Sequence, residues 1–279
     1  MTNSPLTHPR PSPYPFHPNT QSGLAHNATN CFVQTHAVLV TRGPYAPGLL
    51  HSWRAFAASR GTENECPALL PPNQLYCVFV LSDGGASDVE HFEFADAAEV
   101  RAMLLHTALA LGAAEEALQF EHRDLHWGNI LVSRNASGGS LDHMLRGVRL
   151  RADTAGLRVT LIDFTLSRMQ SPQPGAPVAF CDLEGDPEIF AGPKGVAQFD
   201  TYRRMRKAVG RNWEQFCPTT NALWLHYLTD VVLQHKRFAA TREERAALRA
   251  FRTRCAKYSC AGDAALDDLF TGMWEAVPQ

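Results

Sequence analysis

The stretch "FEHRDLHWGNILVSR", residues 120–134, decides how the rest of the chain is interpreted. Its Asp124 follows a histidine and an arginine, and Asn129 comes five residues after this aspartate. The apolar run "NILVSR" that ends the stretch predicts a strand. A second apolar run, "LRVTLIDF" at 157–164, predicts a partner strand that ends beside Asp163. Such a strand pair would bring Asp124, Asn129 and Asp163 into one region.

The spacing H-R-D-x-x-x-x-N is the signature of a protein-kinase catalytic loop. In that chemistry Asp124 accepts the proton of an attacking hydroxyl, while Asn129 and Asp163 hold magnesium ions that bridge the phosphates of ATP. The alternative is that both aspartates are solvated acids in turns, because the triplet H-R-D alone is common by chance. The full signature, followed by two strands that end in Asp-Phe, favours the catalytic interpretation.

Composition limits the other possibilities. The net charge is −2, which gives no reason to expect bulk binding to nucleic acid or to an anionic membrane. The seven cysteines are odd in number and lack CxxC spacing, which predicts reduced thiols and neither a disulfide scaffold nor a zinc site. No segment is expected to provide the roughly 18 apolar residues of a membrane span. Residues 1–30 are rich in Pro, Asn, Ser, Thr and His and predict a disordered tail, or alternatively a Pro-rich ligand.

The remaining pattern predicts an α+β protein that is mainly helical. Two buried strands are expected in 31–43 and 75–81, with a short helix at 49–59 between them. A long helix is expected from Ala95 to Leu118, and the Gly- and Arg-rich insert 135–156 is expected to be a mobile surface loop. Three further helices are predicted in 199–210, 220–234 and 241–258, and a last one in 263–277 with Asp263 as its cap.

Several motifs in order point to one family. The segments "FEHRDLHWGNILV", "IDFTLSR", "FCDLEGDPEIF", "QFDTYRRMRK" and "NALWLHYLTD" resemble the haspin kinases, atypical eukaryotic serine/threonine protein kinases that replace D-F-G with D-Y-T. Here the triplet at 163–165 is D-F-T, and the likeness runs from about Cys31 to Phe251. The resemblance implies a protein-kinase-like fold with a mainly helical C-lobe and a residual two-strand piece of the N-lobe. It places the hinge near 81–85, the catalytic loop at 122–129 and the activation segment at 163–199.

The resemblance also implies roles for individual residues. Asp124 would be the catalytic base, Arg123 would brace the loop, and Asn129 and Asp163 would bind Mg²⁺. His122 would be a buried bracing residue without chemistry of its own, and Asp200 would anchor the catalytic loop from a helix. The backbone of the hinge would hold the adenine of ATP, at Leu81, Ser82 and Asp83.

Haspins phosphorylate a threonine near the basic tail of a histone, and acidic residues around their cleft hold that peptide. The candidates here are His126, Asp88, Glu90, Asp186 and Glu188, and ordinary solvated loop charge is an equal alternative for the four acids. The turn "GPKG", residues 192–195, stands where the family has acidic residues, which weakens the expectation of a histone substrate. A nuclear, mitotic protein is expected by resemblance, otherwise a cytoplasmic one.

One part of kinase chemistry is absent from the sequence. There is no G-x-G-x-x-G, and no lysine precedes Lys194, so the phosphate-clamping lysine has no candidate except Arg42 or Arg54 as a poor substitute. We therefore expect residues 31–279 to be the C-terminal two-thirds of a kinase domain. The alternatives are an inactive, pseudokinase-like module that binds a basic peptide, a decaying gene copy, and, more remotely, a small-molecule kinase. The lone strand pair is expected to expose an apolar face and to cause self-association.

Overall fold

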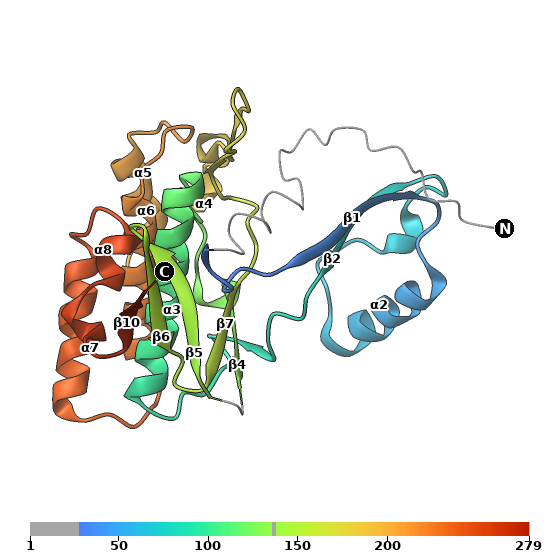
Figure 1. Cartoon of the computed structure of the whole chain (residues 1–279). Helices are drawn as coiled ribbons and strands as arrows, with labels where there is room; N and C mark the ends of the chain where they lie inside the picture. Colours follow the sequence, from blue (N-terminus) through green and yellow to red (C-terminus); the bar gives the residue numbers. More distant parts are fainter. Residues whose placement is uncertain (1–27, 136–137, 279) are drawn as a thin grey trace. The chain divides into compact units, whose positions relative to one another are not determined.

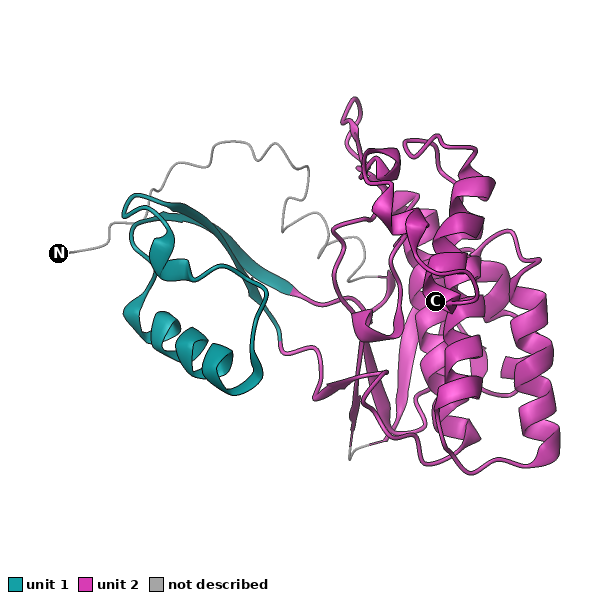
Figure 2. Cartoon of the chain, turned by 180° about the vertical axis from the view of Figure 1, so that it is seen from behind, with its two compact units in different colours: residues 1–12, 35–82 teal, residues 13–34, 83–279 magenta. Residues whose placement is uncertain are grey.

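The computed structural model describes residues 28–135 and 138–278. Only the last three residues of the predicted disordered tail, 1–30, fall within this range. The described chain divides into two compact units, one formed by Thr35–Ser82 and the other by residues up to Gln34 and from Asp83 onward (Figure 2). The second boundary, between Ser82 and Asp83, falls inside the segment predicted to be a hinge.

The first unit consists of an antiparallel ribbon and one helix (Figure 1). Strand β1 (Thr35–Arg42) pairs with β2 (Leu75–Leu81), and between them lie α2 (Pro47–Arg60) and a 3₁₀ turn, Pro67–Leu69. The predicted strands and helix are confirmed, but the expectation that the strands are buried is wrong. Large apolar side chains on this unit are exposed, at 61% for Phe79 and 56% for Val40. Two strands and one helix cannot cover each other's apolar faces, so the predicted open face is present.

The second unit is built around α3 (Ala97–Leu118), which is the central helix of its core. Asp96 caps this helix by accepting the Glu99 N–H at 3.0 Å. Contrary to the sequence-based expectation, α3 is long and apolar enough to cross a membrane by length and composition. However, 89% of its most apolar window is buried within the chain's own fold, which accounts for its hydrophobicity without a bilayer.

The strands that carry the signature residues pair as predicted. Strand β4 (Ile130–Arg134) lies between β3 (Ser87–Asp88) and β7 (Leu157–Leu161) in an antiparallel sheet, with Ile130 opposite Leu161. A separate short ribbon joins β8 (Met169–Gln170) to β9 (Val178–Ala179). The apolar side chains of β4 and β7 face the core around α3, so the sheet fixes the ends of both signature segments.

The insert 135–156 is not a mobile loop where the structure describes it. Strand β5 (Ser140–Leu145) and β6 (Val148–Asp153) form a hairpin, and β10 (Trp274–Val277) adds to it in the order β10-β6-β5. Arg146 and Gly147 form its two-residue turn, both with positive φ, as a tight hairpin requires. Alternate residues such as His143 and Leu150 are buried, a period of two that the arginines and glycines of this segment concealed.

The helices after the ribbon are α4 (Glu188–Ala191), α5 (Ala197–Val209), α6 (Thr219–His235), α7 (Arg242–Cys255) and α8 (Ala261–Ala265). The predictions for α5, α6 and α7 are confirmed, and α7 begins with a capping box. The prediction of one last helix over 263–277 is wrong, because the helical conformation ends early. The chain leaves the helical conformation after α8, forms a 3₁₀ turn (Asp268–Phe270) and ends in β10. The Asp267 carboxylate accepts the Leu269 N–H and binds Arg254, which stabilises this turn in place of a continued helix. Cys260, and not Asp263, is the cap of α8.

The described residues thus form a mixed α/β fold with seven α-helices and four small sheets.

Candidate active site

The loop at 122–129 is shaped by its own backbone. It leaves α3 through Gln119 and then forms an antiparallel bridge in which Glu121 and Arg168 exchange two hydrogen bonds of 2.9 Å. Arg123 has a φ of 65°, which turns the chain sharply, and a 3₁₀ turn (Trp127–Asn129) leads directly into β4. The loop is therefore held at one end by the bridge and at the other by the sheet.

A fully buried ion pair lies under the loop. Arg123 donates to Glu121 from Nη2 at 3.0 Å and from Nε at 3.2 Å, and both side chains are 0% exposed. The carboxylate also accepts the Cys217 N–H at 2.8 Å and the Thr220 hydroxyl at 2.7 Å. The guanidinium lies over the ring of Trp213, 5.3 Å from its centroid. Arg123 therefore positions the loop and does not face the reacting groups.

His122 is also a bracing residue, as expected. Its Nε2–H donates to the Ile162 carbonyl at 3.0 Å, and its backbone N–H donates to Asn221 Oδ1 at 3.0 Å. Burial lowers the pKa of His122 to about 4, so the ring is neutral at physiological pH. It connects the loop to the residue that precedes Asp163.

The structure brings the three signature residues together. Asn129 Nδ2 donates to the carbonyl of Asp124 at 2.9 Å, and the Ile162 N–H donates to the carbonyl of Asn129 at 3.1 Å. Asp163 has a φ of 59° and is exposed, and its Oδ1 accepts the Thr165 N–H at 3.2 Å and the Thr165 hydroxyl at 2.6 Å. The threonine of D-F-T thus fixes the orientation of the Asp163 carboxylate.

Asp124 has an unusual electrostatic environment. Burial raises the pKa of its carboxyl, while a hydrogen bond from the Tyr202 hydroxyl to Oδ1 and the nearby His126 oppose this shift. The carboxylate of Asp163 raises it further, which shows that the two acids act on each other. Burial and the Asp124 carboxylate raise the pKa of Tyr202, so the tyrosine stays protonated and donates.

Oxygen ligands for a magnesium ion are available here. Asp163 offers an exposed carboxylate, and Asn129 offers Oδ1 because its Nδ2 is engaged by Asp124. Hard oxygen donors of this kind are those that Mg²⁺ prefers. The residues present therefore fit the ion that the signature implies.

The acidic candidates fall into two groups. Asp88 and Glu90 flank Val89, whose N–H donates to the carbonyls of Trp127 and Ile130, so this pair lies against the loop. Lys236 Nζ donates to the Glu90 carbonyl at 2.5 Å, and Asp88 accepts from His91 at 2.7 Å.

Asp186 and Glu188 lie on a different segment: Asp186 follows the 3₁₀ turn Leu183–Gly185, Glu188 is the first residue of α4, and both are exposed. His126 belongs to the loop itself, and its Nδ1 accepts the Gly128 N–H at 3.0 Å. Among the described residues, no hydrogen bond or ion pair joins the two acidic groups.

The predicted adenine-binding residues belong to both units: Leu81 and Ser82 to the first, and Asp83 to the second. Leu81 ends β2, and the Ser82 hydroxyl hydrogen-bonds His36 Nε2 at 2.9 Å in the first unit. In the second unit, Asp83 Oδ1 accepts the Gly85 N–H at 3.0 Å.

A model of the haspin-like kinase domain matches residues 13–256 of the sequence. The chain belongs to the haspin-like kinase family. It is 40% identical over 249 residues to a serine/threonine-protein kinase haspin homolog of Arabidopsis thaliana, covering 89% of this chain and 41% of that protein. It is 37% identical over 219 residues to serine/threonine-protein kinase haspin of Bos taurus, covering 78% and 27%. A haspin homolog of Schizosaccharomyces pombe is 36% identical over 225 residues, covering 75% and 45%. The chain thus spans less than half of the length of each of these relatives.

The haspin match begins within the predicted tail and ends within residues that follow α7. It covers the loop, the D-F-T segment and both acidic groups, so the predicted family is confirmed.

One prediction drawn from the haspin resemblance is wrong. Asp200 does not anchor the catalytic loop, because its carboxylate binds Arg203 and accepts the Gly195 N–H at 3.1 Å. The loop is held instead by Glu121, Asn221 and Tyr202, to which the sequence analysis assigned no role. A signal existed for two of them, because Asn221 and Tyr202 lie in the segments "NALWLHYLTD" and "QFDTY" that carry the resemblance.

Proposed function

We propose that this chain carries the catalytic loop and metal ligands of a haspin-type serine/threonine protein kinase that transfers a phosphoryl group from ATP to a hydroxyl in a basic protein tail. The observation that carries this proposal is the joint placement of Asp124, Asn129 and Asp163 by a buried network. The names of its relatives as serine/threonine kinases support the same reaction class.

In this reaction Asp124 accepts the hydroxyl proton of the substrate while its carboxylate is oriented by Tyr202. Asn129 and Asp163 would hold Mg²⁺, and the ion would supply positive charge that offsets the charge of the phosphates. Arg123 acts through Glu121, since the pair fixes the loop without touching the reacting atoms. Thr165 keeps Asp163 in the orientation of a ligand.

A basic substrate is supported by the acids beside the loop. Asp88 and Glu90 are tied to it through Val89, and Asp186 and Glu188 add a second exposed acidic group. A histone tail phosphorylated in the nucleus during mitosis is the corresponding substrate proposal. Lys236 lies close to both acids, since the carboxylates of Asp88 and Glu90 each oppose the lowering of its pKa by burial, and it partly offsets the negative charge of this pair.

The same proposal assigns segments of the chain to the parts of a kinase domain. We assign residues 31–80 to the part of the domain before the hinge, residues 81–85 to the hinge that holds adenine, and 163–199 to the activation segment. Since no lysine precedes Lys194, the phosphate clamp of an active kinase is not supplied by these residues. The second candidate function, an inactive module that binds a basic peptide, needs no such clamp.

Two assays on the same protein separate the candidates. The first measures phosphoryl transfer from radiolabelled ATP to a threonine-containing peptide rich in arginine and lysine, and the second measures binding of that peptide by fluorescence anisotropy. A kinase loses about 10²-fold or more of its rate in Asp124→Asn, whereas the surface variant Asp142→Asn retains it. Peptide binding without transfer, equal in Asp124→Asn and wild type, would refute the kinase and support the binding module.

A further inference from the structure

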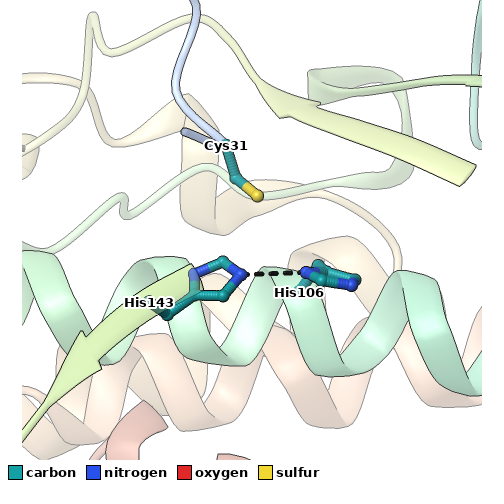
Figure 3. Close-up of side chains that lie close together, drawn as sticks. All are labelled: Cys31, His106 and His143. Atoms are coloured by element: carbon teal, nitrogen blue, oxygen red, sulfur yellow. Dashed lines mark hydrogen bonds between the residues drawn. The ribbon is translucent and has the colours of Figure 1, made fainter. Parts of the chain in front are cut away.

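A cluster of three metal-binding side chains lies in the core of the second unit, away from the signature residues. Cys31 comes from the segment before β1, His106 from the middle of α3 and His143 from β5. Figure 3 shows the thiol and the two rings pointing toward one another. One donor atom of each lies within 4.8 Å of the others, and the three residues are 0–1% exposed. Segments far apart in the sequence thus converge on one small polar site in an apolar core.

The hydrogen bonds fix which atoms can act as ligands. His106 Nε2 lies 3.1 Å from the Asp153 carbonyl, which can only accept, so Nε2 carries the proton and Nδ1 presents a lone pair. That lone pair faces His143 Nε2 at 2.9 Å. A histidine that ligates a metal usually donates its other N–H to a carbonyl in this way. His106 is therefore already oriented as a ligand.

Hydrogen bonds within the described residues do not satisfy every polar atom of the cluster. The link between the two rings uses one nitrogen of His143, and its Nδ1 is buried with no hydrogen-bond partner among the described residues. Burial lowers the pKa of His106 and lowers that of His143 to about 3, so both rings are neutral. Burial raises the pKa of the Cys31 thiol to about 12, so the metal-free thiol is protonated, and binding of a metal cation would release this proton and stabilise the thiolate.

We propose that Cys31, His106 and His143 bind a zinc ion. A sulfur and two imidazole nitrogens are the donors that Zn²⁺ prefers, whereas Mg²⁺ and Ca²⁺ require oxygen. Tetrahedral Zn–N bonds of 2.0–2.1 Å place two nitrogens about 3.3 Å apart, so the rings must separate by only a few tenths of an ångström. The fourth position is taken by a water or another small donor.

The ion would fix a segment that supports the kinase site. The Cys31 carbonyl accepts the Leu161 N–H at 2.6 Å, and the next residue, Phe32, packs against the ring of Phe164 at 5.7 Å. Binding Cys31 to α3 and β5 therefore fastens the residues beside the D-F-T segment. This role is independent of the proposed function, because it concerns only the packing of the second unit.

The test is direct metal analysis of the 279-residue chain, expressed in minimal medium with Zn²⁺ or with Co²⁺ as a spectroscopic probe and purified without chelators or a histidine tag. We expect about one zinc per chain by mass spectrometry of the metal, and a sulfur-to-cobalt charge-transfer band in the near ultraviolet. Cys31→Ala and His143→Asn should lose the band. Cys255→Ala, which removes another fully buried thiol, should keep it.

The proposal is overturned if the wild-type chain holds less than about 0.1 metal per molecule and shows no thiolate band. It is equally overturned if Cys31→Ala or His143→Asn retains the band in full. Should either variant fail to fold, the other and the wild-type spectrum still decide the matter. None of these readouts depends on kinase activity.

Discussion

Replacing Glu121 by alanine should destabilise the second unit strongly. The carboxylate is the acceptor for two donors of Arg123, for the Cys217 N–H and for the Thr220 hydroxyl. In Glu121→Ala the guanidinium of Arg123 stays in a 0% exposed position without its partner. A buried charge that loses its counter-ion cannot recover the hydration it gave up on folding.

Removing one partner of a buried pair costs about 3–5 kcal/mol. In a unit of this size each kcal/mol lowers the melting temperature by about 2–4 °C, so the expected decrease is about 6–20 °C. Urea unfolding followed by tryptophan fluorescence measures the same loss, because Trp213 and Trp224 are buried in this unit. Glu121→Gln, which keeps an acceptor oxygen, should lose less.

The matched control is the surface pair of Asp142 and Arg151, whose side chains are 38% and 43% exposed. Asp142→Ala should leave the unfolding midpoint unchanged within error, since exposed pairs contribute little. If Glu121→Ala unfolds at the same midpoint as this control, the buried network does not hold the catalytic loop, and our account of Arg123 is wrong.

Three other changes test separate features. Tyr202→Phe removes a donor from Asp124 and should raise the pKa of that carboxyl, measured by NMR of ¹³C-labelled carboxylates; an unchanged titration would contradict the contact. Burial raises the pKa of Glu115 from 4.5 to about 7. The contribution of Glu115 to stability is therefore complete below pH 4.5 and is lost as the pH rises through 7. Glu115→Gln should remove this pH dependence of the free energy of unfolding between pH 4.5 and pH 7. The full pKa shift of Glu115 corresponds to about 3 kcal/mol, which urea unfolding at several pH values would measure. Phe79→Glu, on the exposed ribbon, should reduce self-association in light scattering, and a wild type that is a monodisperse monomer at high concentration would refute that expectation.

The sequence predicted best those elements whose signal is local. The strands around Asn129 and Asp163 follow from continuous apolar runs, and α3 follows from apolar residues at helical spacing. The signature itself predicts the order of the proposed base and metal ligands along the chain. Each of these features can be inferred from a short window, because neighbouring residues carry the whole pattern.

The features that the sequence could not reveal depend on contacts between distant segments. The cysteine and histidines of the buried cluster stand at positions 31, 106 and 143, without any recognisable spacing, and only the pairing of β5 with β6 against α3 brings them together. For the strands of the first unit, the sequence predicted the secondary structure but not the burial. Their apolar residues predict strands correctly, but nothing in those residues tells whether another element covers them.

The described contacts that hold the loop at 122–129 come from residues of the second unit. Glu121, Asn221 and the Ile162 carbonyl all belong to it, and they fix His122 and Arg123. A phosphate-clamping lysine contributes nothing to these contacts, so its absence before Lys194 does not prevent the loop from folding. A well-formed loop is therefore expected in an active kinase and in a peptide-binding module alike. Only the effect of Asp124→Asn differs, because it abolishes transfer in the first and leaves binding unchanged in the second.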